Sequence, residues 1–478
     1  MTQLKFISAT GSLKHVRIDT SDHDGLRGIC AMWIMLYHCF LFSTLQVNIL
    51  GNTQLPLYFI LSGFSLTIGY YDRFEYPGLP IRASATDEPI PVADGVVYNE
   101  ALNSAKPSDE VAVEANTRIG SSSSNLQIIT ENRVSEKMGN TSLRPALFYY
   151  NRFVRTMPIY YIGFLLAIPI TLAGYNLYLN PDHDWTSTIV VNIIPVATWL
   201  IKFGNPLDGP AWFVQTCIFL WICFPYLLKR LKPMEDTHLL SIIRISFILQ
   251  MIWVLFFMTL LLALYPDNPI IALYVSTMFP LSRLPLFAMG ICAAILTIRY
   301  IGEVERLPWF TESGQFFPFR WLDFRTTIAD LTCVSSTKWE NSVMRQGATI
   351  LVLTVILITL TIACAEFYAN IWFQAIIVFA HMDLLIGLTL VHGSTALSKV
   401  LRHPVALWFG EISFCLFQTH WLVIFYFIWA VQGRTNDDYK HVLLPAWGIP
   451  LVCVISLLVA AFLYYSIEVP VRKLYRTT

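Results

Sequence analysis

Long apolar segments recur along almost the whole sequence and are separated by polar stretches. A helix needs about 20 mostly apolar residues to cross the hydrocarbon core of a membrane, and most of these segments reach that length. The pattern therefore predicts an all-α, polytopic membrane bundle. The segments occupy residues 26–46, 53–71, 156–175, 187–203, 210–228, 240–265, 270–298, 347–367, 371–393, 404–431 and 443–467.

Composition supports a membrane protein and argues against other classes. Hydrophobic residues make up 55% of the chain and charged residues only 13%, whereas soluble proteins carry about 25% charged residues. The formal net charge is zero, so no basic surface points to a nucleic acid partner. The cysteines lie mostly in apolar segments and form no C-x-x-C motif, which indicates neither a disulfide framework nor a zinc site.

The number of spans depends on residues 187–203, a short segment that contains Asn192, Pro195 and Lys202. Cytosolic loops are enriched in Lys and Arg. If this segment crosses the membrane, the basic loops that follow it all lie outside. If it dips in and returns, or lies at the interface, nearly all basic residues become cytosolic. We therefore predict about ten transmembrane helices with both termini cytosolic. With this topology, all but four of the 32 Lys and Arg residues lie on or near the cytosolic side. The four exceptions are Lys202, Arg283, Arg434 and Lys440.

Polar segments divide the chain into regions. The first 25 residues contain no apolar core of signal-peptide length, so we expect the first apolar helix to be an uncleaved anchor. The insert at 72–147 has few aromatic residues and a serine run, which predicts a largely disordered cytosolic region. The glycosylation triplet that begins at Asn140 would then be a chance match. The predicted regions are a cytosolic tail (1–25), a transmembrane domain (26–71 and 148–467), the insert (72–147) and a second cytosolic tail (468–478).

Two ionisable residues in the first apolar segment are candidates for function, because charged groups within a membrane are costly. Arg27 lies at its cytosolic end and His38 lies eleven residues further along. At about 1.5 Å per residue, roughly 16 Å separates them along the helix axis. His38 is therefore predicted near or just past the midplane. An imidazole there can act as a general base, or it can hold helices together by donating to a backbone carbonyl.

Seven motifs follow one another along the chain: DGLRG with ten residues from Arg27 to His38, PLYFILSGF at 56–64, NRFVRTMPIYY at 151–161, AWFVQTCIFLWICFP at 211–225, RLPLFAMG at 283–290, GEISFCLFQTH at 410–420 and IEVPVRK at 467–473. In this order they resemble the acyltransferase 3 family of membrane-embedded O-acyltransferases. The resemblance covers nearly the whole chain and is interrupted mainly by the insert.

The resemblance implies an enzyme that takes an acyl group, commonly acetyl, from cytosolic acyl-CoA. The acceptor would be a hydroxyl of a carbohydrate, lipid or small molecule. The family's motif maps onto Arg27 and His38, which makes His38 the expected catalytic residue. Arg152 and Arg155 match its R-x-x-R motif. At this spacing they share one helix face and can grip the phosphates of CoA, although positive-inside anchoring would also explain them. Acyl-CoA is thus a substrate, and no permanently bound cofactor is expected.

Five further residues are assigned supporting roles. Asp24 precedes Arg27 within DGLRG, and His420 matches a histidine that the family often shows. Ser62 lies at about the depth of His38, where a small residue favours close helix packing over a covalent acyl-serine. Trp212 or Arg283 would stabilise the tetrahedral oxyanion. Arg283 should face a polar cavity or a carboxylate rather than lipid.

Some features depart from the family or remain open. Many members place a glutamate five residues after the tryptophan, where this chain has Cys217. We also expect no appended hydrolase-like domain of the kind that some members carry. His381, Asp383 and His392 form a second polar stripe. Its spacing would allow a metal site, but helix-helix hydrogen bonding is favoured. The alternative function is a transporter or lipid-handling membrane protein without catalysis. A second alternative is a protein that keeps the acyltransferase scaffold but has lost catalysis and acts as a partner protein.

Overall fold

The structure, a computed structural model, describes residues 2–7, 13–49, 51–71, 145–173, 185–200, 207–264, 271–272, 274–300, 378–391, 396–432 and 443–475. All of them belong to one compact unit, which takes in Met1–Phe74 and Leu143–Thr478. The predicted insert at 72–147 lies outside the described residues except at its end, where the first helix after it begins at Pro145. The apolar segment at 347–367 and His392 also lie outside them.

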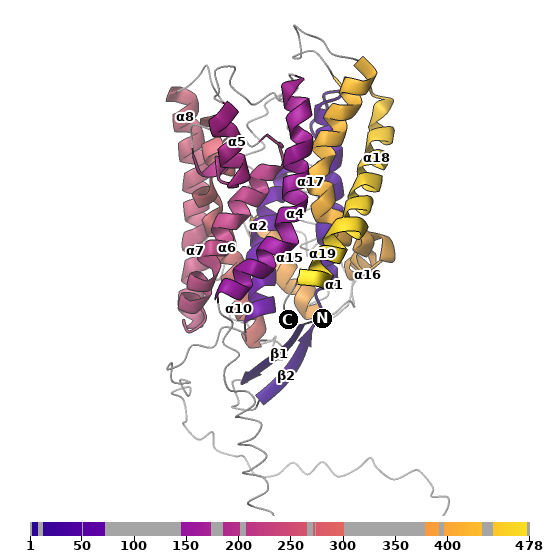
Figure 1. The fold of residues 1–478 in the computed structure, drawn as a ribbon. Coiled ribbons are helices and arrows are strands. Elements are labelled where there is room, and N and C mark those ends of the chain that lie inside the picture. Colours follow the sequence, from indigo (N-terminus) through magenta and orange to yellow (C-terminus); the bar gives the residue numbers. More distant parts are fainter. Residues whose placement is uncertain are drawn as a thin grey trace, which may run out of the picture. The chain divides into compact units, whose positions relative to one another are not determined.

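Helices that lie side by side make up most of the described chain (Figure 1). Short 3-10 and π-helical turns extend or connect several of them, namely η1 (Gly51–Gln54), η2 (Ala197–Trp199), η3 (Trp253–Phe257), η4 (Tyr274–Met278) and η8 (Tyr464–Glu468). The α-helices are α1 (Ser21–Leu41), α2 (Leu55–Tyr70), α4 (Pro145–Leu172), α5 (Trp185–Ile193), α6 (Ala211–Leu231), α7 (Asp236–Ile252), α8 (Met258–Leu264), α10 (Pro280–Tyr300), α15 (Val378–Val391), α16 (Ala396–Leu401), α17 (Pro404–Gln432), α18 (Gly448–Leu463) and α19 (Val469–Tyr475).

Several of these helices have the length and surface of membrane spans. Five are long and apolar enough to cross a membrane, at 145–172, 211–231, 274–299, 404–431 and 448–475. Large apolar side chains on the outside of the bundle expose more than half of their surface, which in water would drive association but which lipid tails accommodate. They include Leu165, Leu172, Ile245, Leu458 and Phe462. The protein is a multi-pass integral membrane protein, as the sequence predicted.

The weakest apolar segment, 187–203, does not form a long helix. Helix α5 ends at Ile193 after nine residues, which at about 1.5 Å per residue gives roughly 14 Å, about half of a 30 Å hydrocarbon core. Polar contacts tie this segment to α6. The backbone N–H of Thr198 donates to Oε1 of Gln215 at 2.9 Å, and Nε1 of Trp199 donates to the Gln215 carbonyl at 3.0 Å. The described helix is therefore too short to cross.

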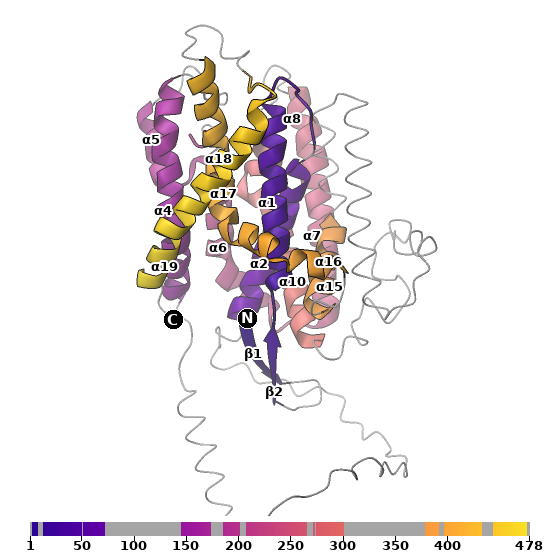
Figure 2. The same cartoon turned by 90° about the vertical axis from the view of Figure 1, so that its right-hand side faces the viewer.

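The chain before α1 contains an element that the sequence did not predict. Strands β1 (Thr2–Ile7) and β2 (Leu13–Ile18) form an antiparallel hairpin in which Thr2 pairs with Ile18. Helix α1 then begins at Ser21, five residues before the predicted span at 26, and the acidic side chains in its first turn suit the positive end of the helix dipole. The hairpin lies at the same end of the bundle as α19 (Figure 2).

Glycines allow two pairs of helices to approach closely. A Cβ on Gly28 in α1 would collide with the backbone at Gly410 in α17. One on Gly63 in α2 would collide with the carbonyl of Phe287 in α10. Apolar side chains from α1, α17 and α18 then form a core cluster, which includes Met35, Leu416 and Val452. Close packing of α1 against α17 brings together the ends of the sequence that carry the candidate residues.

Candidate active site

The predicted catalytic histidine has a second histidine as its partner. Nδ1 of His38 on α1 lies 2.8 Å from Nε2 of His420 on α17. The two rings are nearly parallel, with planes 21° apart, and the ring of Trp421 packs edge-on against His38 with the centroids 5.3 Å apart. The structure thus pairs two residues that the sequence separates by 382 positions.

Hydrogen bonding fixes the tautomers of a neutral pair. Nδ1 of His420 lies 2.9 Å from the carbonyl oxygen of Leu416, and because a carbonyl only accepts, this nitrogen carries the proton. Nε2 of neutral His420 is then an acceptor, so Nδ1 of His38 is the donor between the rings. Nε2 of His38 is left with a free lone pair, as a general base requires.

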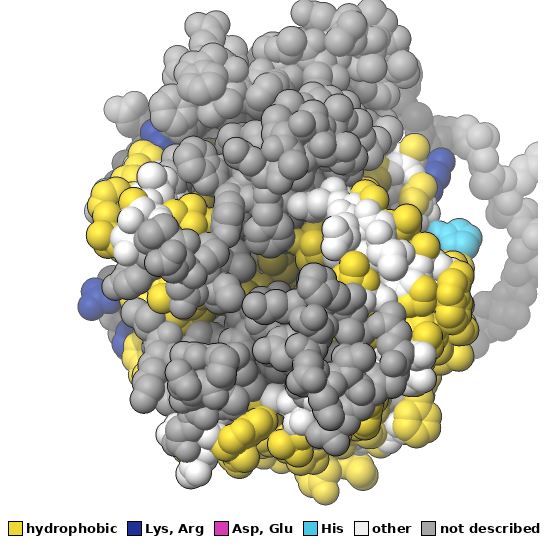
Figure 3. Space-filling model, turned by 90° about the horizontal axis from the view of Figure 1, so that it is seen from above, with side chains coloured by type: hydrophobic (Ala, Val, Ile, Leu, Met, Phe, Trp, Pro, Cys, Tyr) yellow, Lys and Arg dark blue, Asp and Glu magenta, His cyan; other side chains and the backbone are white. Residues whose placement is uncertain are grey.

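A cavity of about 80 Å³ lies beside His38. His38 is one of its lining residues and His420 is not, so the free nitrogen of His38 is the one available to a ligand. Seen from above, hydrophobic side chains are visible near the centre of the molecule and along much of its outer edge (Figure 3). The lining is mostly aromatic and aliphatic, as in most small-molecule sites, and comprises Ile34, Tyr37, His38, Leu55, Gly209, Pro210, Trp212, Met278, Phe417 and Trp421.

A buried acid beside this cavity was missed by the sequence analysis. Asp208 is 1% exposed and directly precedes the lining residues Gly209 and Pro210. One of its carboxylate oxygens accepts a hydrogen bond from Nε2 of Gln418, and the other has no hydrogen-bond partner among the described residues. The available signal was an acidic residue four positions before Trp212, within the turn-rich stretch GNPLDGP. Cys217 is buried in α6.

Arg27 packs against α17 near the N-terminal end of α1. Its Nε donates to Oγ of Ser413 at 3.0 Å and its Nη2 donates to the carbonyl of Gly410 at 2.8 Å. Asp24 forms an ion pair with it at 3.1 Å. About 29% of the Arg27 side chain remains exposed, so part of the guanidinium can still bind an anion.

Arg152 and Arg155 join Arg27 in one basic cluster. Arg155 on α4 lies within electrostatic range of Arg27, Arg152 and Arg472, and of the carboxylate of Glu468. Figure 2 shows how α19, which carries Arg472, lies beside the lower part of α4. The Arg152 guanidinium stacks over Tyr70 at 5.6 Å. Its Nε is buried without a hydrogen-bond partner in the described part of the chain.

This cluster carries more positive than negative charge. Within the described residues neither Arg152 nor Arg155 forms an ion pair, and Glu468 accepts only a weak hydrogen bond from the thiol of Cys415 at 3.4 Å. Half-buried arginines without carboxylate partners favour an anionic ligand, and paired guanidinium groups suit phosphate. Comparisons of the chain with models of protein families, with curated proteins and with solved structures find no match.

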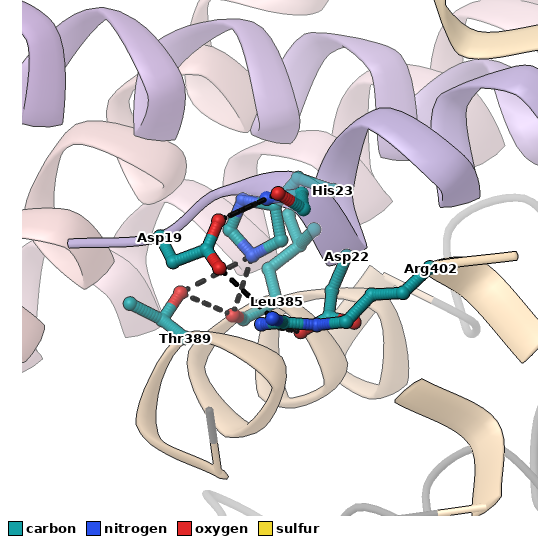
Figure 4. Close-up of polar contacts among 7 residues, drawn as sticks. Asp19, Asp22, His23, Leu385, Thr389 and Arg402 are labelled. Carbon is teal, nitrogen blue, oxygen red and sulfur yellow. Dashed lines mark hydrogen bonds and ion pairs between the residues drawn. The ribbon is translucent and has the colours of Figure 1, made fainter. Parts of the chain in front are cut away.

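The start of α1 is fixed by a charged network (Figure 4). Arg402, in the turn between α16 and α17, donates from Nε and Nη2 to the two carboxylate oxygens of Asp22 at 2.9 Å each. Its Nη1 donates to Asp19 at 2.8 Å. Burial raises the pKa of Asp19, but hydrogen bonds from Ser21 and the charge of Arg402 outweigh it, so the pKa lies below its usual value.

His23 extends this network to α15. Its Nε2 lies 3.1 Å from both the carbonyl oxygen of Leu385 and Oγ1 of Thr389. The network therefore joins α1, α15 and the α16–α17 turn, four residues before Arg27. The polar side chains of Asp22 and His23 are visible in the sequence, but nothing local indicates that their partners lie more than 360 residues away.

The other predicted residues lie away from the cavity. Ser62 is half-buried on α2 and does not line it. Arg283 is fully buried on α10 and does not line it either. The expected carboxylate partner of Arg283 is absent from the described residues. His381 is fully buried with no hydrogen-bond partner there, so the expected helix-helix hydrogen bond is not formed by this residue, and the side chain of Asp383 is not described.

Proposed function

We propose that this protein is a membrane-bound O-acyltransferase that moves an acyl group, acetyl in the simplest case, from cytosolic acyl-CoA to a hydroxyl group of a carbohydrate, lipid or small molecule. The observation that carries the proposal is the histidine pair. His38 lines an apolar cavity with an unprotonated Nε2, while its Nδ1–H is held by His420. This is the arrangement of an oriented general base.

The proposed reaction begins with the acceptor in the cavity, its hydroxyl group donating to Nε2 of His38. His38 takes the proton as the hydroxyl oxygen attacks the carbonyl carbon of the thioester. The C–S bond then breaks, the acyl group stays on the acceptor oxygen, and the proton passes from His38 to the CoA sulfur. The indole N–H of Trp212, which lines the cavity, is the donor that we assign to the tetrahedral oxyanion.

The basic cluster of Arg27, Arg152, Arg155 and Arg472 is the proposed site of the CoA phosphates. It lies at the cytosolic end of α1, roughly 16 Å along the helix from His38. The pantetheine arm of CoA is long enough to bridge this distance. The phosphates would then stay near the cytosol while the thioester reaches the histidine pair.

We further propose about ten spans with both termini cytosolic. Helix α5 is too short to cross by itself, and the N-terminal hairpin and α19 lie at the same end of the bundle (Figure 1). With this topology the basic cluster and the basic residues of 299–345 share one side, which concentrates positive charge where an anionic donor approaches.

Site-directed labelling tests this topology. A cysteine or glycosylation tag within 229–240, within 299–345 or after Arg476 is expected to report the cytosolic side, and one at 178–186 or 433–440 the opposite side. With eleven spans the report from 178–186 would stay the same and the other four would reverse. Such a reversal would contradict the proposed route of the donor.

Arg152→Ala combined with Arg155→Ala is expected to raise the KM for acyl-CoA by at least about 10-fold with little change in kcat. Each charge-assisted contact contributes about 1.5–3 kcal/mol, and contacts to phosphates remote from the reacting atoms stabilise ground and transition states alike. Steady-state kinetics at varied acyl-CoA check this. Arg230→Ala, an exposed cation on α6, is the matched control. A loss confined to kcat would contradict phosphate binding.

Release of free thiol decides between acyl transfer and transport. The purified protein in nanodiscs, given acetyl-CoA and extracts of candidate acceptors, is expected to release CoA only when an acceptor is present. Mass spectrometry of sugars and lipids from cells with and without the gene would identify the acceptor by a lost acyl mass. Substrate flux across proteoliposomes without thiol release would support the transporter instead.

A further inference from the structure

Arg283 is a fully buried charge whose hydrogen-bonding capacity is mostly unused. Its side chain is 0% exposed, and its Nε donates to the carbonyl oxygen of Thr277 at 2.6 Å. Nη1 and Nη2 are both buried and have no hydrogen-bond partner among the described residues. The guanidinium lies over the ring of Phe59, 5.4 Å from its centroid.

An arrangement of this kind is unfavourable without a ligand. A guanidinium stays protonated at neutral pH, and a buried charge is tolerated only when it is paired and hydrogen-bonded. Of the five N–H groups of the guanidinium, only Nε–H donates, to the Thr277 carbonyl, so the four N–H groups of Nη1 and Nη2 are left without an acceptor among the described residues. If this position only had to fill space, an apolar side chain of similar length would stabilise the helix packing better. The retained charge therefore points to a partner that is not part of the described chain.

The surroundings of Arg283 connect it to the cavity. The Phe59 ring that supports the guanidinium lies 6.3 Å from the ring of Trp212, and Trp212 lines the cavity. Thr277, which accepts the hydrogen bond from Nε, is followed directly by the lining residue Met278. The two groups that contact the guanidinium, the Phe59 ring and the Thr277 carbonyl, therefore adjoin residues that line the space beside His38.

We propose that Arg283 anchors an anion-binding site inside the membrane domain, whose ligand carries a phosphate or carboxylate group on an apolar body. The unpaired Nη1 and Nη2 groups form a fork that matches two oxygens of such a group. Phe59 and Trp212 provide apolar contacts for the rest of the ligand. The anion comes from a lipid headgroup or from an acidic molecule that enters the cavity. The site does not depend on acyl transfer, and it is distinct from the cluster around Arg152.

Thermal unfolding of the purified protein in detergent tests the site without any measurement of turnover. The parent is the Arg152→Ala, Arg155→Ala variant, which weakens the other anion site. Decyl phosphate and decanoate are the probes, and decanol is the neutral probe of matched chain length. Both anions are expected to raise the melting temperature of the parent by several degrees at concentrations about 100 times Kd. Decanol is expected to give no such rise.

Added to this parent, Arg283→Met is expected to abolish the response to both anions while leaving the unliganded melting temperature equal or higher, since it removes an unpaired buried charge. Arg283→Lys keeps the positive charge but lacks the two parallel donors of the guanidinium, so it is expected to retain only part of the response. This variant also provides the test if the Arg283→Met protein does not fold. An equal rise in the Arg283→Met protein, or no rise in the parent with either anion, would overturn the proposal.

Two further conditions identify the source of the anion. A rise in nanodiscs when phosphatidic acid replaces part of the phosphatidylcholine, lost in Arg283→Met, assigns the site to a lipid headgroup. A rise with inorganic phosphate in pure phosphatidylcholine, lost in the same variant, assigns it to an acidic molecule from the aqueous side. If the Arg283 protein responds to neither of these conditions and to neither decyl phosphate nor decanoate, the site is not an anion site.

Discussion

Replacing His38 by alanine is expected to lower kcat for acyl transfer by about 10²- to 10⁴-fold, the usual contribution of a general base. Nε2 of His38 is the ring nitrogen left free by the chain of hydrogen bonds from His38 to His420 to the Leu416 carbonyl. Expression and membrane insertion should change little, because one neutral imidazole adds little to the hydrophobicity of a span. The measurement is release of CoA thiol with a saturating acceptor.

Variants of His420 separate the base from the residue that orients it. His420→Gln keeps an oxygen acceptor for Nδ1 of His38 and should retain more activity than His420→Leu, which leaves that N–H without a partner. His403→Ala removes an exposed histidine outside the cavity and should leave the rate unchanged. Wild-type kcat in the His38→Ala protein would remove His38 as the base and with it the proposed mechanism.

Arg402→Ala is expected to give the largest loss of stability, about 3–5 kcal/mol, as for other buried ion pairs that lose one partner. Asp22 is only 1% exposed and receives two hydrogen bonds from Arg402. Without the guanidinium, its carboxylate would remain buried and uncompensated. The change should appear as a lower melting temperature of the detergent-solubilised protein.

A double-mutant cycle tests this explanation. Asp22→Asn in the Arg402→Ala background should recover part of the lost stability, because it removes the uncompensated charge. Lys399→Ala, which removes an exposed cation on α16, should change stability by less than about 0.5 kcal/mol. If Arg402→Ala were no more destabilising than Lys399→Ala, the network in Figure 4 would not fix the start of α1.

Apolar periodicity predicted the described membrane helices well but not their ends. The segment at 404–431 coincides with α17 almost residue for residue, and the segment at 53–71 contains α2. Helix α1 begins five residues before the predicted span. The reason is that its first turn carries charges that Arg402 neutralises, and that partner lies far away in the sequence.

The sequence by itself determined that this chain enters the membrane many times, because the free energy of burying an apolar segment in lipid depends on the segment's own residues. It also singled out Arg27 and His38, because ionisable side chains are conspicuous within apolar helices, whereas Arg152 and Arg155 were chosen through their match to a motif.

Only the tertiary structure decided how these residues are partnered. The pairing of His38 with His420, the isolation of Arg283 and the carboxylate of Asp208 beside the cavity depend on which faces of distant helices meet. That choice rests on close contacts such as the one between Gly28 and Gly410, and no local pattern of hydrophobic and polar residues encodes it.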